Sequence, residues 1–253
     1  FGMSRYQMDH ELSKLASRNG AKIMHATVID VKLLNRKDAF QVLTKTGDNF
    51  KAKIIIGAYG KRSNLDIALE RKFIKKRAPY LGVKVHASGY FPDDNVALHN
   101  FKGGYCGVSK VENDRINLCY ITNFKSFKKY KNINDFQEQV MFNNKALKEI
   151  FERSTIEFDQ PLTISQISFE TKQPVENHML MCGDSAGMIH PLCGNGMGMA
   201  IRSAQLACHL IINYLNTKIS DRKTLEYLYN KTWQKTFRSR LKTGHTIAYL
   251  FRQ

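Results

Sequence analysis

The sequence predicts an α/β fold into which a mostly antiparallel β domain is inserted. Three observations predict it. A glycine-rich stretch, residues 183–198, joins a short apolar strand to a long helix, as at the carboxyl edge of an open α/β sheet. The apolar run 54–56 ends at Gly57, which is typical of a parallel strand followed by a tight loop. Between residues 78 and 125, short runs of alternating polarity are separated by turn residues, which is typical of an antiparallel sheet.

The elements before residue 60 follow from local signals. Residues 6–18 place apolar side chains on one helical face, and Asn19–Gly20 end that helix. Residues 21–35 and 40–58 are expected to form strands, with a hairpin turn at 46–49. The run 54–56 is expected to be buried.

The remaining elements follow in order. We expect antiparallel strands at 80–88, 95–101, 103–111 and 115–123, then one helix over 135–153 and a further strand at 162–171. Residues 179–182 form the short apolar strand. Helices are predicted at 196–215, with Ala200, Ala204 and Ala207 on the packed face, and at 221–251.

Composition limits the class of protein. The chain has 253 residues, 43% of them hydrophobic and 24% charged, which is ordinary for a globular protein. These residues contain no apolar run of membrane-spanning length, and no secretory leader is visible, so we expect neither a membrane span nor secretion. Five scattered cysteines without a CxxC spacing argue against a disulfide framework and a zinc site, so we expect reduced thiols, a cytoplasmic protein and no metal.

The formal net charge is +17, which leaves several partners open. Nucleic acid, an anionic membrane surface and an acidic cofactor are all attracted by such a surface. The lysines are spread along the chain, and no helix-turn-helix, zinc-finger or ribonucleoprotein signature accompanies them. We therefore disfavour nucleic acid, and the main alternative is a basic surface that is merely solvated.

The glycine-rich stretch suggests a ligand site. The start of the helix at Gly196 presents unpaired N–H groups, which suit a phosphate or another electron-rich group. Asp184 has the wrong sign for a phosphate but can accept hydrogen bonds from a sugar or polyol. The plain alternative is a turn that only joins strand to helix.

The segment GDSAGMIHPLCGNGMGMAI resembles the second flavin motif of the superfamily that includes aromatic hydroxylases, flavin-dependent halogenases and geranylgeranyl reductases. In that superfamily the aspartate holds the ribityl chain of FAD, and the helix start points toward the pyrophosphate and the flavin ring. The resemblance implies FAD binding by eight residues of the segment: Gly183, Asp184, Pro191, Gly194, Asn195, Gly196, Met197 and Gly198.

Other segments resemble the same superfamily in order and spacing. SRYQMDHEL is similar to a helix whose arginine contacts FAD, which implies that role for Arg5, and the backbone near Val28 would approach the adenine end. Tyr59 stands where an aspartate is usual in a Gly-Ala-Asp-Gly loop, which puts binding of a pyridine nucleotide there in doubt. GGYCG, from Gly103, looks like a strand pair of the geranylgeranyl reductase branch.

The resemblance also implies a domain organisation. The superfamily opens with a strand–GxGxxG–helix unit, which these residues do not contain. We therefore expect a partial FAD-binding domain of the glutathione reductase-like, aromatic-hydroxylase type, formed by residues 1–66 and 178–253. A mostly antiparallel substrate domain, 67–177, is inserted between them.

In this superfamily the flavin performs the difficult chemistry, and no catalytic residue is assigned here. His190 is interpreted as structural and Cys193 as an apolar filler, with proton transfer and redox roles as the alternatives. Tyr105 and Cys106 are expected to line the substrate cavity. Trp233 and Phe237 are expected in the core.

The resemblance implies an FAD-dependent oxidoreductase that acts on a hydrophobic or lipid substrate, with NAD(P)H as a possible electron donor. The leading interpretation is a geranylgeranyl reductase-like enzyme that reduces isoprenoid double bonds. The alternative is an aromatic monooxygenase or halogenase. A basic, non-catalytic module that binds anionic lipid or nucleic acid is a further alternative, and the basic surface also suggests peripheral contact with the inner face of a membrane.

Overall fold

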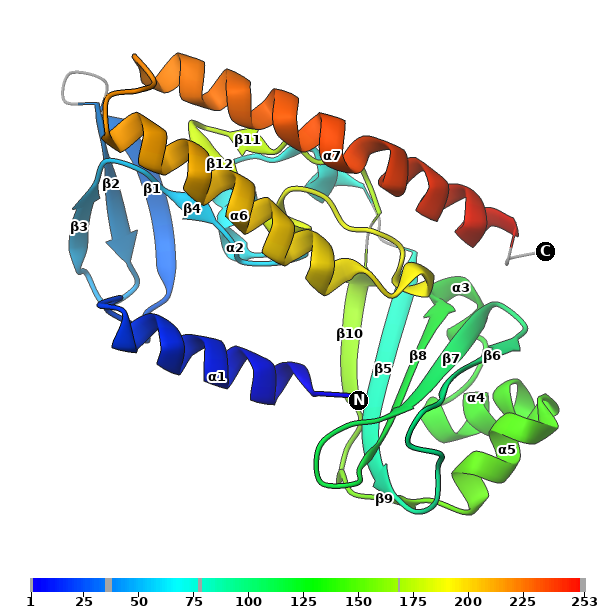
Figure 1. Cartoon of the computed structure of the whole chain (residues 1–253). Coiled ribbons are helices and arrows are strands. Elements are labelled where there is room, and N and C mark those ends of the chain that lie inside the picture. The colour runs from blue at the N-terminus through cyan, green and yellow to red at the C-terminus, as the bar shows by residue number, and fades with distance from the viewer. Residues whose placement is uncertain (1, 35–37, 77–78, 168, 251–253) are drawn as a thin grey trace. The chain divides into compact units, whose positions relative to one another are not determined.

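A computed structural model describes residues 2–34, 38–76, 79–167 and 169–250 of the chain (Figure 1). The chain divides into two compact units. Unit 1 consists of Phe1–Met24 and Ala78–Ile167, and unit 2 consists of His25–Arg77 and Ser168–Gln253. Each unit has its own hydrophobic core. The assignment of flavin and substrate roles to ranges of the chain stays a prediction.

Unit 1 is built around an antiparallel sheet with the strand order β10-β5-β8-β7-β6. The predicted strands are confirmed to within one residue at each end, except that the strand expected at 162–171 ends at Ile167. Strand β9 is an addition that pairs with the end of β5. The strands are β5 (Tyr80–Ser88), β6 (Val96–Phe101), β7 (Gly104–Lys110), β8 (Ile116–Asn123), β9 (Thr155–Ile156) and β10 (Leu162–Ile167). β5 and β8 pair without a break from Tyr80↔Asn123 to Ala87↔Ile116, so alternate side chains of both strands share one face.

Short helices cover the apolar face of this sheet: α3 (Phe124–Phe127), α4 (Ile133–Gln139) and α5 (Lys145–Glu152) (Figure 1). Fully buried Phe136 of α4 stacks on Tyr120 of β8 and is ringed by further aromatic side chains. The prediction of one helix over 135–153 is wrong. The chain leaves the helix at Val140, passes through the 3₁₀ turn η3 (Met141–Asn143), and starts α5 after Asn144, whose side chain accepts a bond from the amide of Leu147.

The alternation of the strands corrects one expectation about the substrate cavity. Cys106 on β7 is fully buried among the core residues of unit 1, so the prediction that it lines a cavity is wrong. Its neighbour Tyr105 is half-buried and points to the opposite face of the sheet, since successive residues of a strand alternate.

Helix α1 (Arg5–Arg18) also belongs to unit 1 and is confirmed by the structure. Ser4 caps it, accepting a bond from the amide of Gln7, while the amide of Ser4 donates to Glu112 at 2.7 Å. At the other end the helix stops at Asn19, and Gly20 takes a left-handed conformation (φ +90°), as its sequence position predicts. None of the residues of α1 is buried.

Unit 2 contains an antiparallel meander of β1 (Val28–Leu34), β2 (Ala39–Thr44) and β3 (Asn49–Ala52). The predicted hairpin turn lies between β2 and β3, with Gly47 at φ +91°. The first predicted strand was placed too early, because pairing starts only at Val28. Its last residue, Asn35, lies outside the described residues, as does Phe251 at the end of the last predicted helix.

The second sheet of unit 2 has the order β11-β12-β4, formed by β11 (Val175–Glu176), β12 (Met179–Met181) and β4 (Ile56–Gly57). β4 pairs parallel with β12, as predicted for the run that ends at Gly57. The expectation that this run is buried is wrong: Ile56 is 42% exposed. Among the described residues β4 has one neighbour only, so one side of the strand is open.

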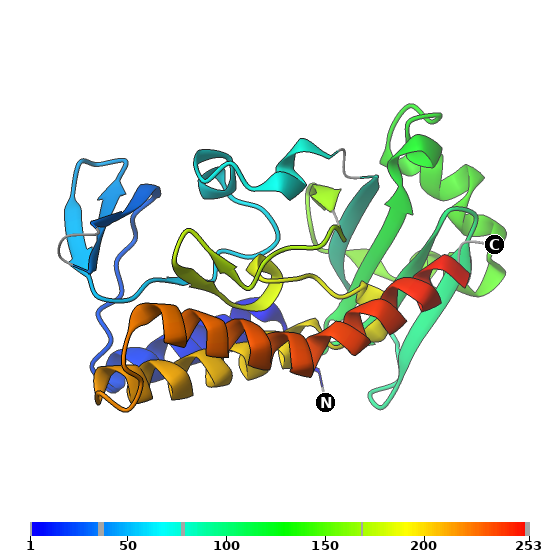
Figure 2. The ribbon, with the colours of Figure 1, turned by 90° about the horizontal axis from the view of Figure 1, so that it is seen from above.

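Two long helices, α6 (Gly196–Leu215) and α7 (Arg222–Leu250), run side by side in unit 2 (Figures 1 and 2). The buried residues of α6 are Met199, Ser203 and Ala207, whereas Ala204 is exposed, so its predicted place on the packed face is wrong. On α7 the side chains of Trp233 and Phe237 are buried one turn apart, as predicted for core residues.

Two further helical segments lie near the carboxyl ends of the parallel strands. α2 (Asn64–Ala68) begins with a capping box in which Ser63 and Asp66 bond each other's backbone. The 3₁₀ turn η2 (Lys72–Lys75) follows it. Both elements belong to unit 2, where they bring charged side chains next to the turn after β12.

Candidate functional site

The site begins where strand β12 ends. The chain makes the 3₁₀ turn η4 (Gly183–Ser185), and Gly183 has a left-handed conformation (φ +58°). A Cβ atom on Gly183 would lie 3.1 Å from the Cβ of Ala200 on α6, and the amide of Gly183 donates to Ser203 Oγ at 2.8 Å. Glycine is required here both for its backbone conformation and for the close approach of the helix.

The loop that follows is anchored at His190. This side chain is 5% exposed, its Nδ1 accepts a bond from the amide of Leu192, and its ring lies 4.6 Å from that of Phe169. The short turn η5 (Pro191–Cys193) then leads to Gly194 at φ +58°. These contacts support the structural interpretation of His190.

The start of α6 forms the next part of the site, with the side-chain oxygen of Asn195 beside Gly198. Asn195 caps the helix without a side-chain hydrogen bond, and a Cβ atom on Gly196 would meet no atom within 4 Å. Met197 is 43% exposed. The main-chain N–H groups of the first helical turn point along the helix axis and carry partial positive charge. The arrangement therefore fits an electron-rich group, such as a phosphate or a flavin ring edge, at the start of α6.

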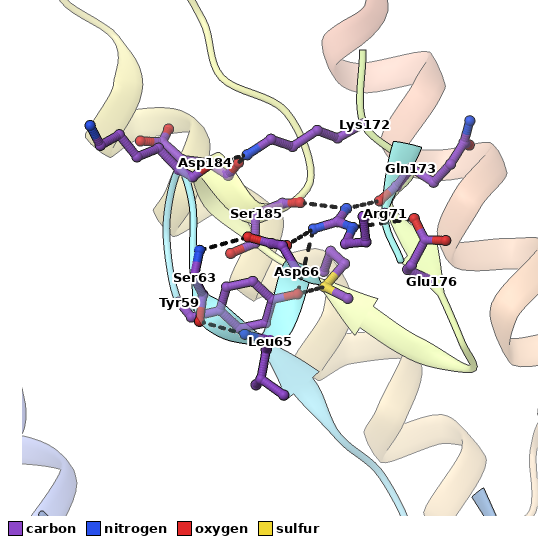
Figure 3. Close-up of polar contacts among 12 residues, drawn as sticks. Tyr59, Ser63, Leu65, Asp66, Arg71, Lys172, Gln173, Glu176, Asp184 and Ser185 are labelled. Carbon is purple, nitrogen blue, oxygen red and sulfur yellow. Dashed lines mark hydrogen bonds and ion pairs between the residues drawn. The ribbon is translucent and has the colours of Figure 1, made fainter. Parts of the chain in front are cut away.

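A buried arginine supports the turn after β12 (Figure 3). Arg71 is 2% exposed, and its Nη1 forms an ion pair with fully buried Asp66 at 2.9 Å. Its Nε lies 3.3 Å from Glu176, and its Nη2 donates to the main-chain oxygens of Ser185 at 3.0 Å and Gln173 at 3.3 Å. The guanidinium thus joins α2, β11 and the Gly183–Ser185 turn.

A buried lysine lies beside it (Figure 3). Lys172 is 4% exposed, and its Nζ donates to the main-chain oxygens of Lys61 and Asp184, at 2.6 Å each. The same nitrogen lies 4.4 Å from the ring centroid of Phe73, a favourable position for a cation. Burial, together with the nearby charge of Arg71, lowers the pKa of Lys172 to about 8.

Tyr59 occupies the position where the resembled superfamily has an aspartate. Its hydroxyl lies 3.5 Å from Arg71 Nη1 and 3.6 Å from Met181 Sδ, and burial raises its pKa to about 12. Next along the loop, Lys61 is half-buried, and burial together with Arg62 lowers its pKa, while Asp184 opposes that effect. This loop therefore has a phenol where the resemblance predicts an aspartate, followed by the cations of Lys61 and Arg62.

The structure brings most of the predicted site residues together. Gly183, Asp184 and the residues from Pro191 to Gly198 follow one another around the start of α6, and Val28, the first residue of β1, is also in unit 2. Arg5 lies in unit 1 at the start of α1, where it is 65% exposed and forms an ion pair with Asp9 at 2.9 Å. The predicted contacts of these residues with FAD stay predictions.

Arg71 and Lys172 were not among the predicted site residues. Arg71 belongs to the segment RKFIKKR, which looks like an ordinary basic surface, and Lys172 follows β10 without any motif. The capping box of α2 was a usable signal, because Ser63 and Asp66 have the S-x-x-D spacing and fix the acid that Arg71 meets.

A match to a protein-family model identifies the family of this chain. The family model described as squalene epoxidase matches residues 112–248, more than half of the chain. This chain belongs to the squalene epoxidase family. The match includes strand β8, Lys172, the Gly183–Ser185 turn, α6 and α7 as far as residue 248, whereas Tyr59, Asp66 and Arg71 lie outside it. The predicted membership of the wider FAD-dependent oxidoreductase superfamily is confirmed.

Two curated proteins are similar to this chain in sequence. An uncharacterised protein of Methanocaldococcus jannaschii is 34% identical over 110 residues, which are 43% of this chain and 26% of that protein. Conditioned medium factor receptor 1 of Dictyostelium discoideum is 23% identical over 270 residues, covering 99% of this chain and 51% of the receptor. The chain thus spans about half of the amoebal relative and about a quarter of the archaeal one.

Solved structures share the fold at low identity. HpxO of Klebsiella pneumoniae, complexed with FAD and uric acid, matches with a TM-score of 0.72 and 14% identity, over 98% of this chain and 64% of HpxO. The flavin-dependent halogenase CmlS matches with a TM-score of 0.69 and 16% identity, over 93% of this chain and 44% of CmlS. The predicted fold class is confirmed by these similarities.

The described residues hold neither a helix that is long and apolar enough to cross the bilayer nor a group of three or more metal-ligating side chains. All five cysteines are free thiols.

Proposed function

We propose that this protein is an FAD-dependent oxidoreductase and that unit 2 holds part of the flavin. The observation that carries the proposal is the arrangement of β12, the Gly183–Ser185 turn and the N-terminus of α6. A strand end, a carboxylate and a helix start without a side-chain cap are found within one short segment. FAD-bound HpxO and a flavin-dependent halogenase share the fold, which supports the same cofactor here.

Each part of the segment has a distinct role in this proposal. The Asp184 carboxylate accepts hydrogen bonds from hydroxyl groups of the ribityl chain, and the amides of Gly196, Met197 and Gly198 face electron-rich atoms of the cofactor. Met197, exposed on the first turn, gives apolar contact. When bound, the flavin supplies the electron transfer, and the protein orients it and excludes water.

For the reaction itself, we propose oxygenation of a hydrophobic, lipid-like substrate. The match to the squalene epoxidase family supports a monooxygenase. A halogenase and a urate-binding flavoprotein among the structures of the same fold are consistent with chemistry that uses molecular oxygen. We therefore rank oxygenation ahead of reduction, and the aromatic monooxygenase or halogenase of the sequence analysis stays an alternative with a different substrate.

Reduction of isoprenoid double bonds is the second candidate, favoured by the Gly-Gly-Tyr segment. A Cβ atom on Gly104 would lie 2.1 Å from the main-chain oxygen of Ile121, and Gly103 has φ +86°. The hairpin between β6 and β7 therefore needs both glycines, and the support for this candidate is the resemblance of the GGYCG segment to the reductase branch. The same hydrophobic substrate class suits both reactions.

We also propose how the flavin is reduced and where in the cell the protein acts. Tyr59 and the two cations beside it replace the usual acid, so we propose that NAD(P)H, where it is the donor, binds elsewhere or reduces the flavin through a partner. The net charge of +17 supports contact with an anionic membrane surface from the cytoplasm.

The cofactor is tested first, in the purified full-length protein. A visible spectrum with the two absorption bands of oxidised flavin is expected, and Asp184→Ala is expected to weaken FAD binding roughly tenfold, the effect of losing hydrogen bonds to a charged group. Asp93→Ala, which removes an exposed carboxylate of unit 1, is the matched control. A colourless protein that binds anionic vesicles and does not take up FAD would instead support the basic, non-catalytic module.

The reaction is tested by incubating the flavin-loaded protein with squalene and with a geranylgeranyl lipid, in air and without oxygen. A product that gains one oxygen atom, formed only in air, supports the monooxygenase. A product that gains two hydrogen atoms without oxygen present supports the reductase instead. Mass spectrometry of the extracted lipid separates the two outcomes.

A further inference from the structure

We propose that Lys172 and Arg71 are positioning residues that hold the Gly183–Ser185 turn in the conformation that presents the Asp184 carboxylate to the cofactor. This inference rests on the proposed flavin function. We call the two side chains the cation clamp. The clamp acts on the main chain of the turn, and neither residue belongs to the flavin motif that the sequence reveals.

The clamp fixes two consecutive main-chain oxygens. Lys172 Nζ donates to the oxygen of Asp184 at 2.6 Å, and Arg71 Nη2 donates to the oxygen of Ser185 at 3.0 Å (Figure 3). On the other side of the aspartate, the amide of Gly183 is held by Ser203 Oγ at 2.8 Å. Because the backbone is anchored on both sides, the point from which the Asp184 side chain extends is fixed.

The same lysine joins the turn to the loop after β4. Its Nζ donates to the oxygen of Lys61 at 2.6 Å, so one ammonium group bridges the carboxyl ends of two adjacent parallel strands. In open α/β sheets this edge is where ligands bind. A change at Lys172 therefore alters the spacing of both loops at that edge.

The two cations differ in how their charges are balanced. Arg71 has carboxylate partners, Asp66 at 2.9 Å and Glu176 at 3.3 Å. Lys172 is held by main-chain oxygens and the face of Phe73. The Lys172 ammonium therefore holds the turn through neutral groups, whereas the Arg71 guanidinium is also held by two carboxylates.

The charge of Lys172 changes within an accessible pH range. Burial and the charges of Arg71 and Lys61 lower its pKa, and those of Asp66 and Asp184 raise it, with the result near 8. A neutral amine donates weaker hydrogen bonds to carbonyl oxygens than an ammonium does. The clamp is therefore expected to loosen between pH 7 and pH 9.

The test measures FAD affinity at pH 7, 8 and 9 in the full-length protein, using the wild type, Lys172→Met and Lys172→Arg. The wild type is expected to lose roughly tenfold in affinity across this range, since charge assistance accounts for about that factor per hydrogen bond. The Lys172→Met protein should bind FAD weakly at all three pH values. The Lys172→Arg protein, whose side chain stays charged, should bind FAD more tightly than Lys172→Met, with an affinity that does not change with pH. Lys76→Met removes an exposed lysine of unit 2 and should follow the wild type.

Two results overturn the proposal. One is an FAD affinity of the wild type that does not change between pH 7 and pH 9. This measurement does not depend on the folding of any variant. The other is a Lys172→Met protein with wild-type affinity and a wild-type pH profile. A lysine that only stabilised the fold would shift the melting temperature and leave the pH profile of FAD binding unchanged.

Failure of the clamp is distinguishable from failure of the flavin function. If the wild type takes up no FAD at all, the flavin function fails. Hydrogen exchange of the amides from 183 to 187 then tests the clamp alone. Faster exchange in Lys172→Met than in Lys76→Met supports a held turn, and equal rates contradict it.

Discussion

The hydroxyl of Ser185 lies 2.9 Å from the amide nitrogen of Gly60 and 3.1 Å from its carbonyl oxygen. One fully buried side chain thus satisfies both main-chain groups of a residue 125 positions away. The serine of the flavin motif therefore does more than continue the turn: it fixes the distance between the loops that follow β4 and β12.

Replacement of this hydroxyl should be costly. Ser185→Ala leaves the Gly60 amide and carbonyl without their partner, and we expect a loss of about 1–3 kcal/mol in the free energy of unfolding. Chemical denaturation of the two proteins measures it. Ser13→Ala, on exposed α1, is the control and should change stability by about 0.5 kcal/mol or less. A Ser185→Ala protein as stable as that control would contradict the assigned role.

Two glycines of the motif allow their strain and packing effects to be separated. Gly183 and Gly194 share φ +58°, but a Cβ atom meets Ala200 at 3.1 Å in the first case and nothing within 4 Å in the second. Gly194→Ala should therefore destabilise by about 1–2 kcal/mol from backbone strain. Gly183→Ala adds crowding against α6, about 1–3 kcal/mol more. Equal melting temperatures for the two variants would show that α6 moves away freely.

The buried ion pair of Arg71 should be sensitive to loss of its acid. Asp66→Ala removes the 2.9 Å partner and one half of the capping box, leaving a buried guanidinium with the more exposed Glu176. We expect a loss of about 3–5 kcal/mol in stability. Asp9→Ala breaks an exposed ion pair with Arg5 and should change stability by less than about 0.5 kcal/mol. Calorimetry on both variants tests the contrast.

Stability and cofactor affinity should respond to pH in opposite directions. The pKa of Lys172 is near 8 in the folded chain and near 10.5 when unfolded, so between these values unfolding takes up a proton. The contribution of this lysine to stability is therefore lowest below pH 8 and increases as the pH rises toward 10.5. The stability of the wild type relative to Lys172→Met should thus grow from pH 8 to pH 10, while its FAD affinity falls.

Much of the fold was predictable because its signals are local. The alternation in β5 to β8 and the Gly47 turn depend on neighbouring residues, and so does the strand–glycine–helix order of the flavin motif. The long helix predicted over 135–153 failed for a local reason as well. The apolar spacing from Phe136 to Leu147 fits one helix, but Asn144 favours a capping role over a place in the helix interior.

The supporting residues were not predictable, because their partners are distant in sequence. Arg71 donates a hydrogen bond to the main-chain oxygen of Ser185, 114 residues away in sequence, and Lys172 donates one to that of Lys61, 111 residues away. In the sequence each is one basic residue among 39. The pairing of β4 with β12 places the two loops at one edge of the sheet, where both cations bind the main chain of the turn.

The packing of α7 against the motif loop provides a built-in optical probe. The single tryptophan of the chain, Trp233, lies so close to Gly187 that a Cβ atom there would be 2.9 Å from the indole ring. Gly187 follows the Gly183–Ser185 turn by two residues. Indole emission therefore originates beside the segment proposed to hold the cofactor, and its quenching by a bound flavin would report occupancy without any added label.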